Sequence, residues 1–477
     1  MKLTRRAAWI GAATLLAGCA VGPDYKKPDV ENMPTAWAGD IPFNTARPND
    51  AAVKGNWWEL FHDDKLNELE QRAIAQNQTL KLAATRLEQA HAQVRVARAG
   101  LFPQIGLSAG AAREEVPPKP LAPQTDIGVG FDVNYEVDLF GRVRRTVESA
   151  QAGDQQAGAD FENTRLLLQA ELAADYFTLR ELDTEIEVVR QGIVLEVKAL
   201  DFVTSRHDLG LASGLDLAQQ QALLDSTKTQ LELLQNQRAQ NEHALAVMTG
   251  TPAPLFHIDA AQVNLVPPVM PVGVPSDVLQ RRPDVASAER AMAQANANIG
   301  VAKAAYFPSI AIGPTPLEDS LGYSNNKLSN LFSAPNLVWS LGASLTQTIF
   351  DAGRTAATVK IAEQSYQGSV ASYRQSVLVA MQEVEDGISG AALLQRASNQ
   401  ADAAVHSSQK AFDLANDRYT GGLDTYLDVI TAEQTLLTNQ RQATQIHGQQ
   451  MLTSVYLVKA LGGGWQGLEQ GNLQAAK

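Results

Sequence analysis

An internal duplication constrains the fold of this chain more than its length does. The segment Ala99-Gly100-Leu101-Phe102-Pro103 recurs 205 residues later as Ala304-Ala305-Tyr306-Phe307-Pro308. The motif Asp138-Leu139-Phe140-Gly141-Arg142 recurs as Phe350-Asp351-Ala352-Gly353-Arg354, with its glycines 212 residues apart. Similarity at a nearly fixed offset indicates one architecture written twice. The 477 residues therefore predict two similar halves, where length alone would suggest two or three unrelated domains.

Long helices are expected after each Gly-Arg motif. Apolar residues between Phe161 and Ile193 recur at steps of three, four and seven, the seam of a helix that packs lengthwise on another helix. The pattern predicts long helices over residues 161–206 and 373–417, with return helices over 215–248 and 427–461. Earlier helices over 65–100 and 276–305 should end at the Phe-Pro motifs, because proline restricts the residue before it. This pattern alone also fits an antiparallel coiled coil.

Strands with two distinct faces separate the helices. Apolar residues from Ile127 to Leu139 alternate without error with polar residues or glycines, and these 13 residues exceed the roughly nine to eleven that cross a bilayer. Segments 105–111 and 337–346 also alternate, whereas Pro314 and Pro316 interrupt the segment after Phe307. We predict four strands per chain, in hairpins 102–140 and 307–351. The face expected to line a barrel lumen carries Asp132, Asn134, Glu136 and Asp138.

Four strands cannot close a barrel, because the smallest closed barrels have about eight. Closure therefore needs other chains. Two copies would supply eight strands and three copies twelve, so the residues predict an oligomer without fixing its number.

The N-terminus has the anatomy of a lipoprotein signal. Lys2, Arg5 and Arg6 precede a short apolar run that ends in Leu16-Ala17-Gly18-Cys19. We expect cleavage before Cys19 and covalent lipid on this cysteine; an ordinary signal with an unmodified cysteine is the alternative. Cleavage removes three basic residues and no acidic ones, which changes the net charge from -13 to -16. Ala20 in place of an aspartate favours the outer membrane, and no later stretch has the apolar length of a transmembrane helix.

Composition and motifs argue against several other functions. A net charge of -13 gives no basic surface for nucleic acid, and a single cysteine cannot form an intrachain disulfide. Gly106-Leu107-Ser108-Ala109-Gly110 spells the GxSxG of a hydrolase, but it falls on an alternating strand with no helix after it. The seven histidines form no pair at helical ligand spacing. We expect no enzyme activity, no metal and no cofactor other than the lipid.

The ordered set of motifs resembles a known family. It comprises the Cys19 lipobox, Trp57-Trp58-Glu59-Leu60-Phe61, Arg282-Pro283-Asp284-Val285, Ala288-Glu289, and both Phe-Pro and Gly-Arg pairs. This set resembles the outer-membrane efflux lipoproteins of the NodT and OprM type, relatives of TolC. The resemblance implies a mainly helical homotrimer with a shared twelve-stranded outer-membrane barrel and a long periplasmic helical barrel.

The same resemblance implies a function and partners. The chain would be the passive exit duct of a tripartite efflux system, docked to a periplasmic adaptor and an inner-membrane transporter of the RND class. An ABC or MFS exporter is the alternative transporter. The exit duct of a type I protein secretion system is the alternative function, and a lipid-anchored structural coiled coil is a third hypothesis. The transported substrates cannot be read from the sequence.

The turns at the helical tips carry the expected gate. If the last helix begins near Leu423, one of its faces carries Asp424, Leu427, Asp428 and Thr431. Threefold rings of carboxylates would favour cations, and a leucine ring would narrow the opening. The resemblance implies that Leu427 and Asp428 form the constriction and that Tyr419 pairs with Asp216, the repeat equivalent of Asp428. The plain alternative is that these acids are solvated helix-start residues.

Adaptor docking is expected at the two turns, through Gly210, Leu211, Gly422 and Leu423. The predicted organisation is a signal (1–18), an extended lipid-anchored segment (19–64), two repeats (65–265 and 266–465) and a tail (466–477). The helical hairpins of the repeats should span 143–249 and 355–461.

Overall fold

The computed structural model describes residues 20–28, 34, 37–38, 56–114, 123–263, 266–268, 281–313 and 321–463. The predicted signal, Cys19 and the predicted tail lie outside these residues. The chain divides into two compact units. Unit 1 contains Met1–Val30, Thr85–Ala159 and Ala286–Gln375, and unit 2 contains Glu31–Ala84, Asp160–Val285 and Ser376–Lys477. Each unit therefore combines segments from both halves of the repeat.

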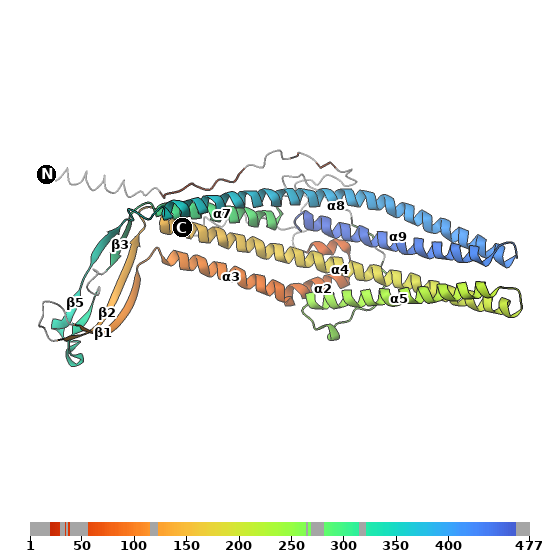
Figure 1. Ribbon diagram of the computed structural model, residues 1–477, viewed down its shortest axis with the longest axis horizontal. Helices are drawn as coiled ribbons and strands as arrows, with labels where there is room; N and C mark the ends of the chain where they lie inside the picture. Colours follow the sequence, from red (N-terminus) through yellow and green to blue (C-terminus); the bar gives the residue numbers. More distant parts are fainter. Residues whose placement is uncertain are drawn as a thin grey trace. The chain divides into compact units, whose positions relative to one another are not determined.

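Two pairs of long helices have equal lengths (Figure 1). α4 (Arg142–Asp208) and α8 (Arg354–Thr420) have 67 residues each, and α5 (Gly214–Met248) and α9 (Tyr426–Ala460) have 35 each. The corresponding bounds lie 212 residues apart, the offset of the Gly-Arg motif. A helix of 67 residues is about 100 Å long at 1.5 Å per residue.

The long helices begin 19 residues earlier than the heptad seam predicted. Their first turns are capped by the acid of each Gly-Arg motif. Asp138 accepts the backbone N–H of Val143 at 3.0 Å, and Asp351 accepts that of Thr355 at 2.8 Å. These caps satisfy N–H groups that have no partner inside the helix. The sequence after Arg142 is rich in alanine, glycine and glutamine, so it carried no apolar seam to mark the start.

The helix expected over residues 65–100 is two helices. α2 (Asp64–Gln76) and α3 (Gln78–Ala99) are separated by Asn77, whose backbone is extended. The Asn77 side chain accepts the N–H of Leu80 at 2.9 Å, so a capping residue replaces a helical one. The counterpart in the second half, α7, spans Pro283–Ala304. Across the described ranges, no helix combines the length and apolar character that a bilayer crossing requires.

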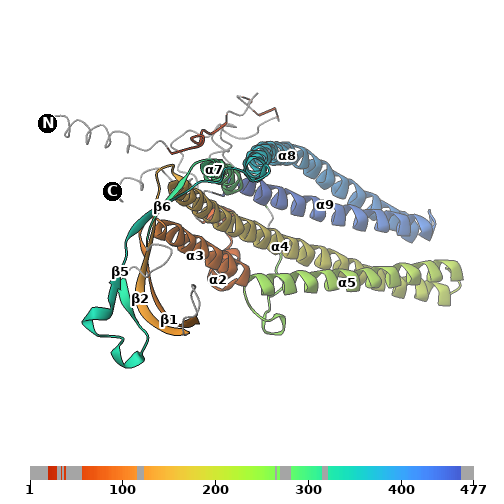
Figure 2. The same ribbon diagram turned by 60° about the vertical axis from the view of Figure 1, so that its left-hand side comes forward.

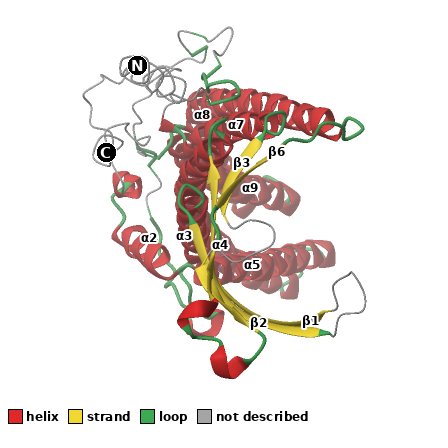
Figure 3. Ribbon diagram, turned by 90° about the vertical axis from the view of Figure 1, so that its left-hand side faces the viewer, coloured by secondary structure: helices red, strands yellow, loops and turns green. Residues whose placement is uncertain are grey.

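Six strand segments of unit 1 form one sheet (Figure 3). β1 (Gln104–Glu114) pairs antiparallel with β2 (Gln124–Val137). On its other side, β2 pairs with β3 (Ser309–Gly313) near one end and with β4 (Leu321–Asn325) near the other. β6 (Gly342–Thr346) pairs with β3, and β5 (Leu337–Trp339) pairs with β4. The four expected strands are therefore four lanes, of which the third and fourth are each split into two segments.

The register places like residues opposite one another. Ile105 lies opposite Val133, Leu107 opposite Phe131 and Ala109 opposite Val129. Between these pairs, Gly106 lies opposite Asp132 and Ser108 opposite Gly130. One face of the β1–β2 pair is thus apolar and the other is polar or glycine, as the alternation predicted.

Unit 2 buries its main core around a short element that the sequence had suggested was extended. η1 (Trp57–Phe61) lies within the predicted extended segment 19–64, yet Trp57 and Trp58 are almost fully buried. They pack edge to face and join a cluster with Leu172 and Phe177 of α4. In unit 2, α4 with α5 and α8 with α9 form two antiparallel hairpins (Figure 2). Large aromatic side chains near the start of unit 2 therefore fix where the hairpins pack.

Candidate functional site

The turns of the two hairpins are built alike. Gly210 and Gly422 both adopt φ +73°, a left-handed conformation that favours glycine. Leu211 N–H donates to the carbonyl of Arg206 at 2.8 Å, and Leu423 N–H donates to that of Arg418 at 2.8 Å. This is the hydrogen-bond pattern of the Schellman motif, which ends a helix tightly.

The turns project apolar side chains. Leu211 and Leu423 are 64% and 72% exposed, and neighbouring Leu209 is also exposed. Exposed leucines at a turn have no role in the core of this chain. The structure thus places the predicted docking residues on the surface, and their role stays a prediction.

The start of α9 separates its residues into two faces. Leu427, Asp428 and Thr431 are exposed, whereas Tyr426 and Ile430 are buried. Asp428 accepts the hydroxyl of Thr425 at 2.7 Å. The structure therefore brings three of the expected gate residues onto one solvent-facing strip of α9.

Asp424 does not belong to this strip. α9 begins at Tyr426, three residues later than the expected start near Leu423, so Asp424 precedes the helix. Its carboxylate accepts a hydrogen bond from Arg418 Nε at 2.5 Å, and this bond holds the pKa of Asp424 below its ordinary value. The placement of Asp424 on the helix face was wrong, because the Arg418 ion pair belongs to the turn and the helix starts only after Thr425.

The expected pair of Tyr419 and Asp216 is not hydrogen-bonded. Asp216 and Ser213 form a capping box at the start of α5, with Ser213 N–H donating to Asp216 at 2.9 Å. Tyr419 is buried, and its hydroxyl has no hydrogen-bond partner among the described residues. Its ring lies 4.9 Å from the guanidinium carbon of Arg206. Burial raises the pKa of Tyr419.

A different tyrosine connects the two hairpins. Tyr426 of α9 donates its hydroxyl to Gln220 of α5 at 2.7 Å, and Gln220 donates to the backbone carbonyl of Glu196 on α4 at 3.1 Å. Tyr426 also packs with Val203 and Leu223 of the first hairpin. Sequence reasoning missed this contact, although Tyr426, Ile430 and Glu433 fall at helical spacing on the face opposite Leu427.

Two acids of the expected lumen face are engaged at the end of the sheet. Glu136 accepts two hydrogen bonds from Arg142, one of them at 2.8 Å. Asp138 lies beyond the end of β2 at Val137 and caps α4. The assignment of Asp138 to the strand face was therefore wrong, because its carboxylate is committed to the helix start. Asp132 and Asn134 lie within β2, and their role in a lumen stays a prediction.

The GxSxG segment lies within β1. The hydroxyl of Ser108 donates to the carbonyl of Gly130 at 3.3 Å, and the strand continues to Glu114. A nucleophile elbow requires a sharp turn into a helix directly after the serine. The geometry around Ser108 is that of a paired strand.

Residues 20–28, which follow Cys19, form a strap on unit 1. Arg145 of α4, with a side chain only 6% exposed, donates to Asp24 at 2.9 Å and to the carbonyls of Val21 and Gly22 at 3.3 Å. Lys27 pairs with Glu289 of α7 at 2.7 Å. Gly22 approaches α7 so closely that a Cβ there would lie 2.5 Å from the Cα of Gly300. The strap is therefore held by a buried guanidinium and by glycine contacts.

Comparison with known proteins decides the family. The profile described as outer membrane efflux protein matches residues 69–251 and 274–463, which is more than half of the chain. The chain belongs to the outer membrane efflux protein family. It is 30% identical over 478 residues to the probable efflux pump outer membrane protein TtgC of Pseudomonas putida, covering 97% of this chain and 96% of the relative. It is also 30% identical to the pyoverdine export outer membrane protein OpmQ of Pseudomonas aeruginosa, over 97% of both chains.

Solved structures of this outer membrane efflux family have the same fold. The outer-membrane channel OprN matches with a TM-score of 0.86 and 28% identity, covering 94% of this chain and 100% of that one. The open state of the MtrE channel of Neisseria gonorrhoeae matches with a TM-score of 0.80 and 27% identity, covering 94% and 98%. The expected TolC-like fold class and efflux function are confirmed. The protein is an outer-membrane efflux channel that extends into the periplasm.

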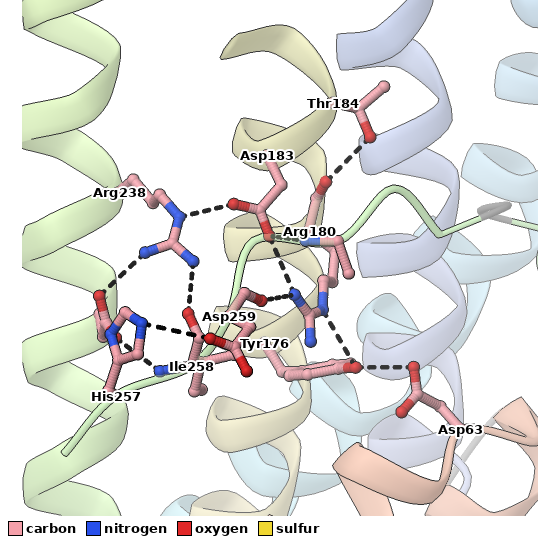
Figure 4. Close-up of polar contacts among 11 residues, drawn as sticks. Asp63, Tyr176, Arg180, Asp183, Thr184, Arg238, His257, Ile258 and Asp259 are labelled. Atoms are coloured by element: carbon pink, nitrogen blue, oxygen red, sulfur yellow. Dashed lines mark hydrogen bonds and ion pairs between the residues drawn. The ribbon is translucent and has the colours of Figure 1, made fainter. Parts of the chain in front are cut away.

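A buried polar network braces the first hairpin of this efflux protein (Figure 4). Asp183 of α4 accepts from Arg180 at 2.9 Å and from Arg238 of α5 at 2.5 Å. The same arginines donate to the backbone carbonyls of Asp259 and Ile258 at 2.8 and 2.7 Å. Because the side chain of Asp183 is 1% exposed, its charge depends on both arginines. The network therefore fixes α4, α5 and the segment after α5 in one arrangement.

Proposed function

We propose that three copies of this chain form a passive exit duct across the outer membrane. The observation that carries this proposal is the exposed apolar face of the β1–β2 pair. Ile105 and Leu107 are 72% and 69% exposed, and they lie opposite Val133 and Phe131. Such a face is unfavourable in water and favourable against lipid hydrocarbon.

The number of copies follows from closure. One chain supplies four lanes of strand, with β1 at one edge and β5 and β6 at the other. Edges left open in a bilayer would leave backbone N–H and C=O groups without partners, which costs several kcal/mol for each group. Three copies supply the twelve lanes expected for this family, and their helical hairpins would form the periplasmic tunnel.

We further propose that Cys19 carries the lipid anchor. Ala20, the first described residue, leads directly into the strap held by Arg145. The strap lies on unit 1, which also contains the sheet. Acyl chains on Cys19 would add apolar area to that of the sheet in the same membrane.

The partners follow from the family and from the turns. TtgC is an outer-membrane protein of an efflux pump, and this likeness supports small-molecule efflux over protein secretion for the present chain. The duct would receive substrates from an inner-membrane transporter of the RND class through a periplasmic adaptor. Exposed Leu211 and Leu423 at the turns offer apolar contacts for the adaptor. Asp428 and Leu427 would form the gate of the tunnel.

The proposal is tested with the full-length precursor expressed in a Gram-negative host and extracted from its outer membrane. Native mass spectrometry should give the mass of three acylated chains, and the protein should conduct ions in planar bilayers. A Cys19→Ala variant should lose only the acyl mass. Monomers or dimers that do not conduct would contradict the trimeric duct, and an unmodified Cys19 would contradict the anchor.

A further inference from the structure

Two buried carboxyl groups lie between the hairpins, close to the candidate gate. Glu196 of α4 is 1% exposed and Glu433 of α9 is 6% exposed. The hydroxyl of Thr227 donates to Oε1 of Glu196 at 2.8 Å. The Oε2 atoms of both glutamates have no hydrogen-bond partner among the described residues. Burying a carboxylate without a partner costs several kcal/mol, whereas a protonated carboxyl avoids most of that cost.

The surrounding charges do not compensate these carboxyls. No lysine or arginine of the described chain forms an ion pair with either glutamate, although Lys228 of α5 acts on Glu196 from a distance. The groups nearby on the other elements are Tyr419 of α8, Tyr426 of α9, and Asp216 of α5, which adds negative charge. Arg206 of α4 stacks on Tyr419. Burial, and then the charge of Glu196, raise the pKa of Glu433 to about 7.

We propose that Glu196 and Glu433 form a proton-dependent latch between the two hairpins. When both carboxyls are protonated, α9 packs against α4. Loss of their protons places two like charges in a buried layer, and the repulsion favours separation of the hairpins. The latch rests on the proposed function, because it acts on the gate of the duct.

The latch connects to the gate through α9 itself. Glu433, Ile430 and Tyr426 occupy the buried face of the helix, and Leu427, Asp428 and Thr431 occupy the exposed face. Gln220 links this layer a second time, because it accepts from Tyr426 and donates to the carbonyl of Glu196. A helix that leaves this layer carries its exposed strip with it. Release of the latch therefore moves the constriction.

The direction of the pH effect follows from proton binding. In a solvated, open tip the Glu433 carboxyl has its ordinary pKa of 4.5, whereas in the packed tip the pKa is about 7. The packed tip thus holds a proton that the open tip lacks between these two values. As pH rises from 4.5 to 7, the ratio of open to packed tips should increase by up to about tenfold per pH unit, and above pH 7 it should level off.

The test is bilayer conductance of the full-length trimer between pH 4.5 and 8. We expect the open probability of the unsubstituted channel to rise with pH up to about pH 7. Glu433→Gln, which stays neutral, should be closed more often and should lose this rise. Glu232→Gln, the same change at an exposed glutamate of α5, should behave like the unsubstituted channel. An unchanged pH dependence in Glu433→Gln would overturn the latch.

A second measurement separates the latch from the duct. Hydrogen exchange of residues 426–433 at pH 7.5 is compared between Glu433→Gln and the unsubstituted protein, so that the intrinsic pH dependence of exchange cancels. Several-fold slower exchange in the variant supports the latch even for a preparation that does not conduct, which would count against the proposed function alone. Equal or faster exchange overturns the latch in a conducting channel.

Discussion

The hydroxyl of Tyr426 on α9 donates to the side-chain carbonyl of Gln220 on α5 at 2.7 Å, and both residues are buried. Residues 206 positions apart thereby join the two hairpins next to the exposed strip of Leu427 and Asp428. A buried hydrogen bond between two mobile elements stabilises one arrangement of them over others. This bond makes Tyr426, more than Tyr419, the residue that holds the candidate gate closed.

Replacing Tyr426 by phenylalanine should loosen the tip. The change removes the hydroxyl and leaves the buried Gln220 oxygen without its donor, which should cost about 1–3 kcal/mol of packing between the hairpins. We expect a higher open probability in single-channel recordings at every pH. Because Glu433 is untouched, the pH dependence should keep its slope. A conductance equal to that of the unsubstituted channel would show that this bond does not hold the gate.

Replacing Asp428 by alanine should change ion passage without disturbing the packing. Asp428 is exposed and accepts only the Thr425 hydroxyl in the described contacts. We expect a larger or less stable single-channel conductance and weaker block by multivalent cations, because a ring of negative charge is lost. Asp413→Ala removes an exposed carboxylate further up α8 and serves as the matched control. Unchanged conductance and block in Asp428→Ala would reject this gate assignment.

Asp183 offers a test of the brace around the first hairpin. Asp183→Ala would leave Arg180 and Arg238 without their shared buried partner, and we expect a loss of about 3–5 kcal/mol in stability. Thermal unfolding followed by circular dichroism should show a clearly lower midpoint. Asp259→Ala removes a carboxylate that is 99% exposed and should change stability by less than about 0.5 kcal/mol. Equal midpoints for the two variants would show that the Asp183 network does not stabilise the hairpin.

The strap can be tested by proteolysis. Arg145→Ala removes the ion pair to Asp24 and the bonds to the carbonyls of Val21 and Gly22. We expect faster tryptic cleavage after Lys26 and Lys27, because a segment without its contacts opens more often. Arg144→Ala, which loses contacts to Asp138 instead, should leave strap cleavage unchanged. Equal cleavage rates in both variants would contradict the role of Arg145.

Local patterns in the sequence predicted much of the fold. Heptad spacing indicated the long hairpins, strict alternation indicated β2, and glycine at 210 and 422 indicated the tight turns. The early starts of α4 and α8 were missed because capping acids set them, in a stretch with no apolar seam. The split at Asn77 was missed because a single asparagine can continue a helix or cap the next one.

The site was less predictable, because it depends on pairs distant in sequence. Asp428 and Leu427 could be placed on a face from helical spacing. The ion pair of Arg418 with Asp424 and the bond of Tyr426 with Gln220 depend on the helix start and on how two hairpins meet. The buried layer of Glu196 and Glu433 joins residues 237 positions apart, and no local pattern marks such a pair.

The most direct test of a threefold gate uses the scarcity of cysteine in this chain. Its only cysteine is Cys19, so Asp428→Cys introduces a single additional thiol per chain. Single channels of this variant are recorded while a positively charged methanethiosulfonate reagent is added. We expect the current to fall in three successive steps, one for each subunit, with no effect on the unsubstituted channel. A current that does not change on complete modification of the thiol would contradict the placement of Asp428 in the gate.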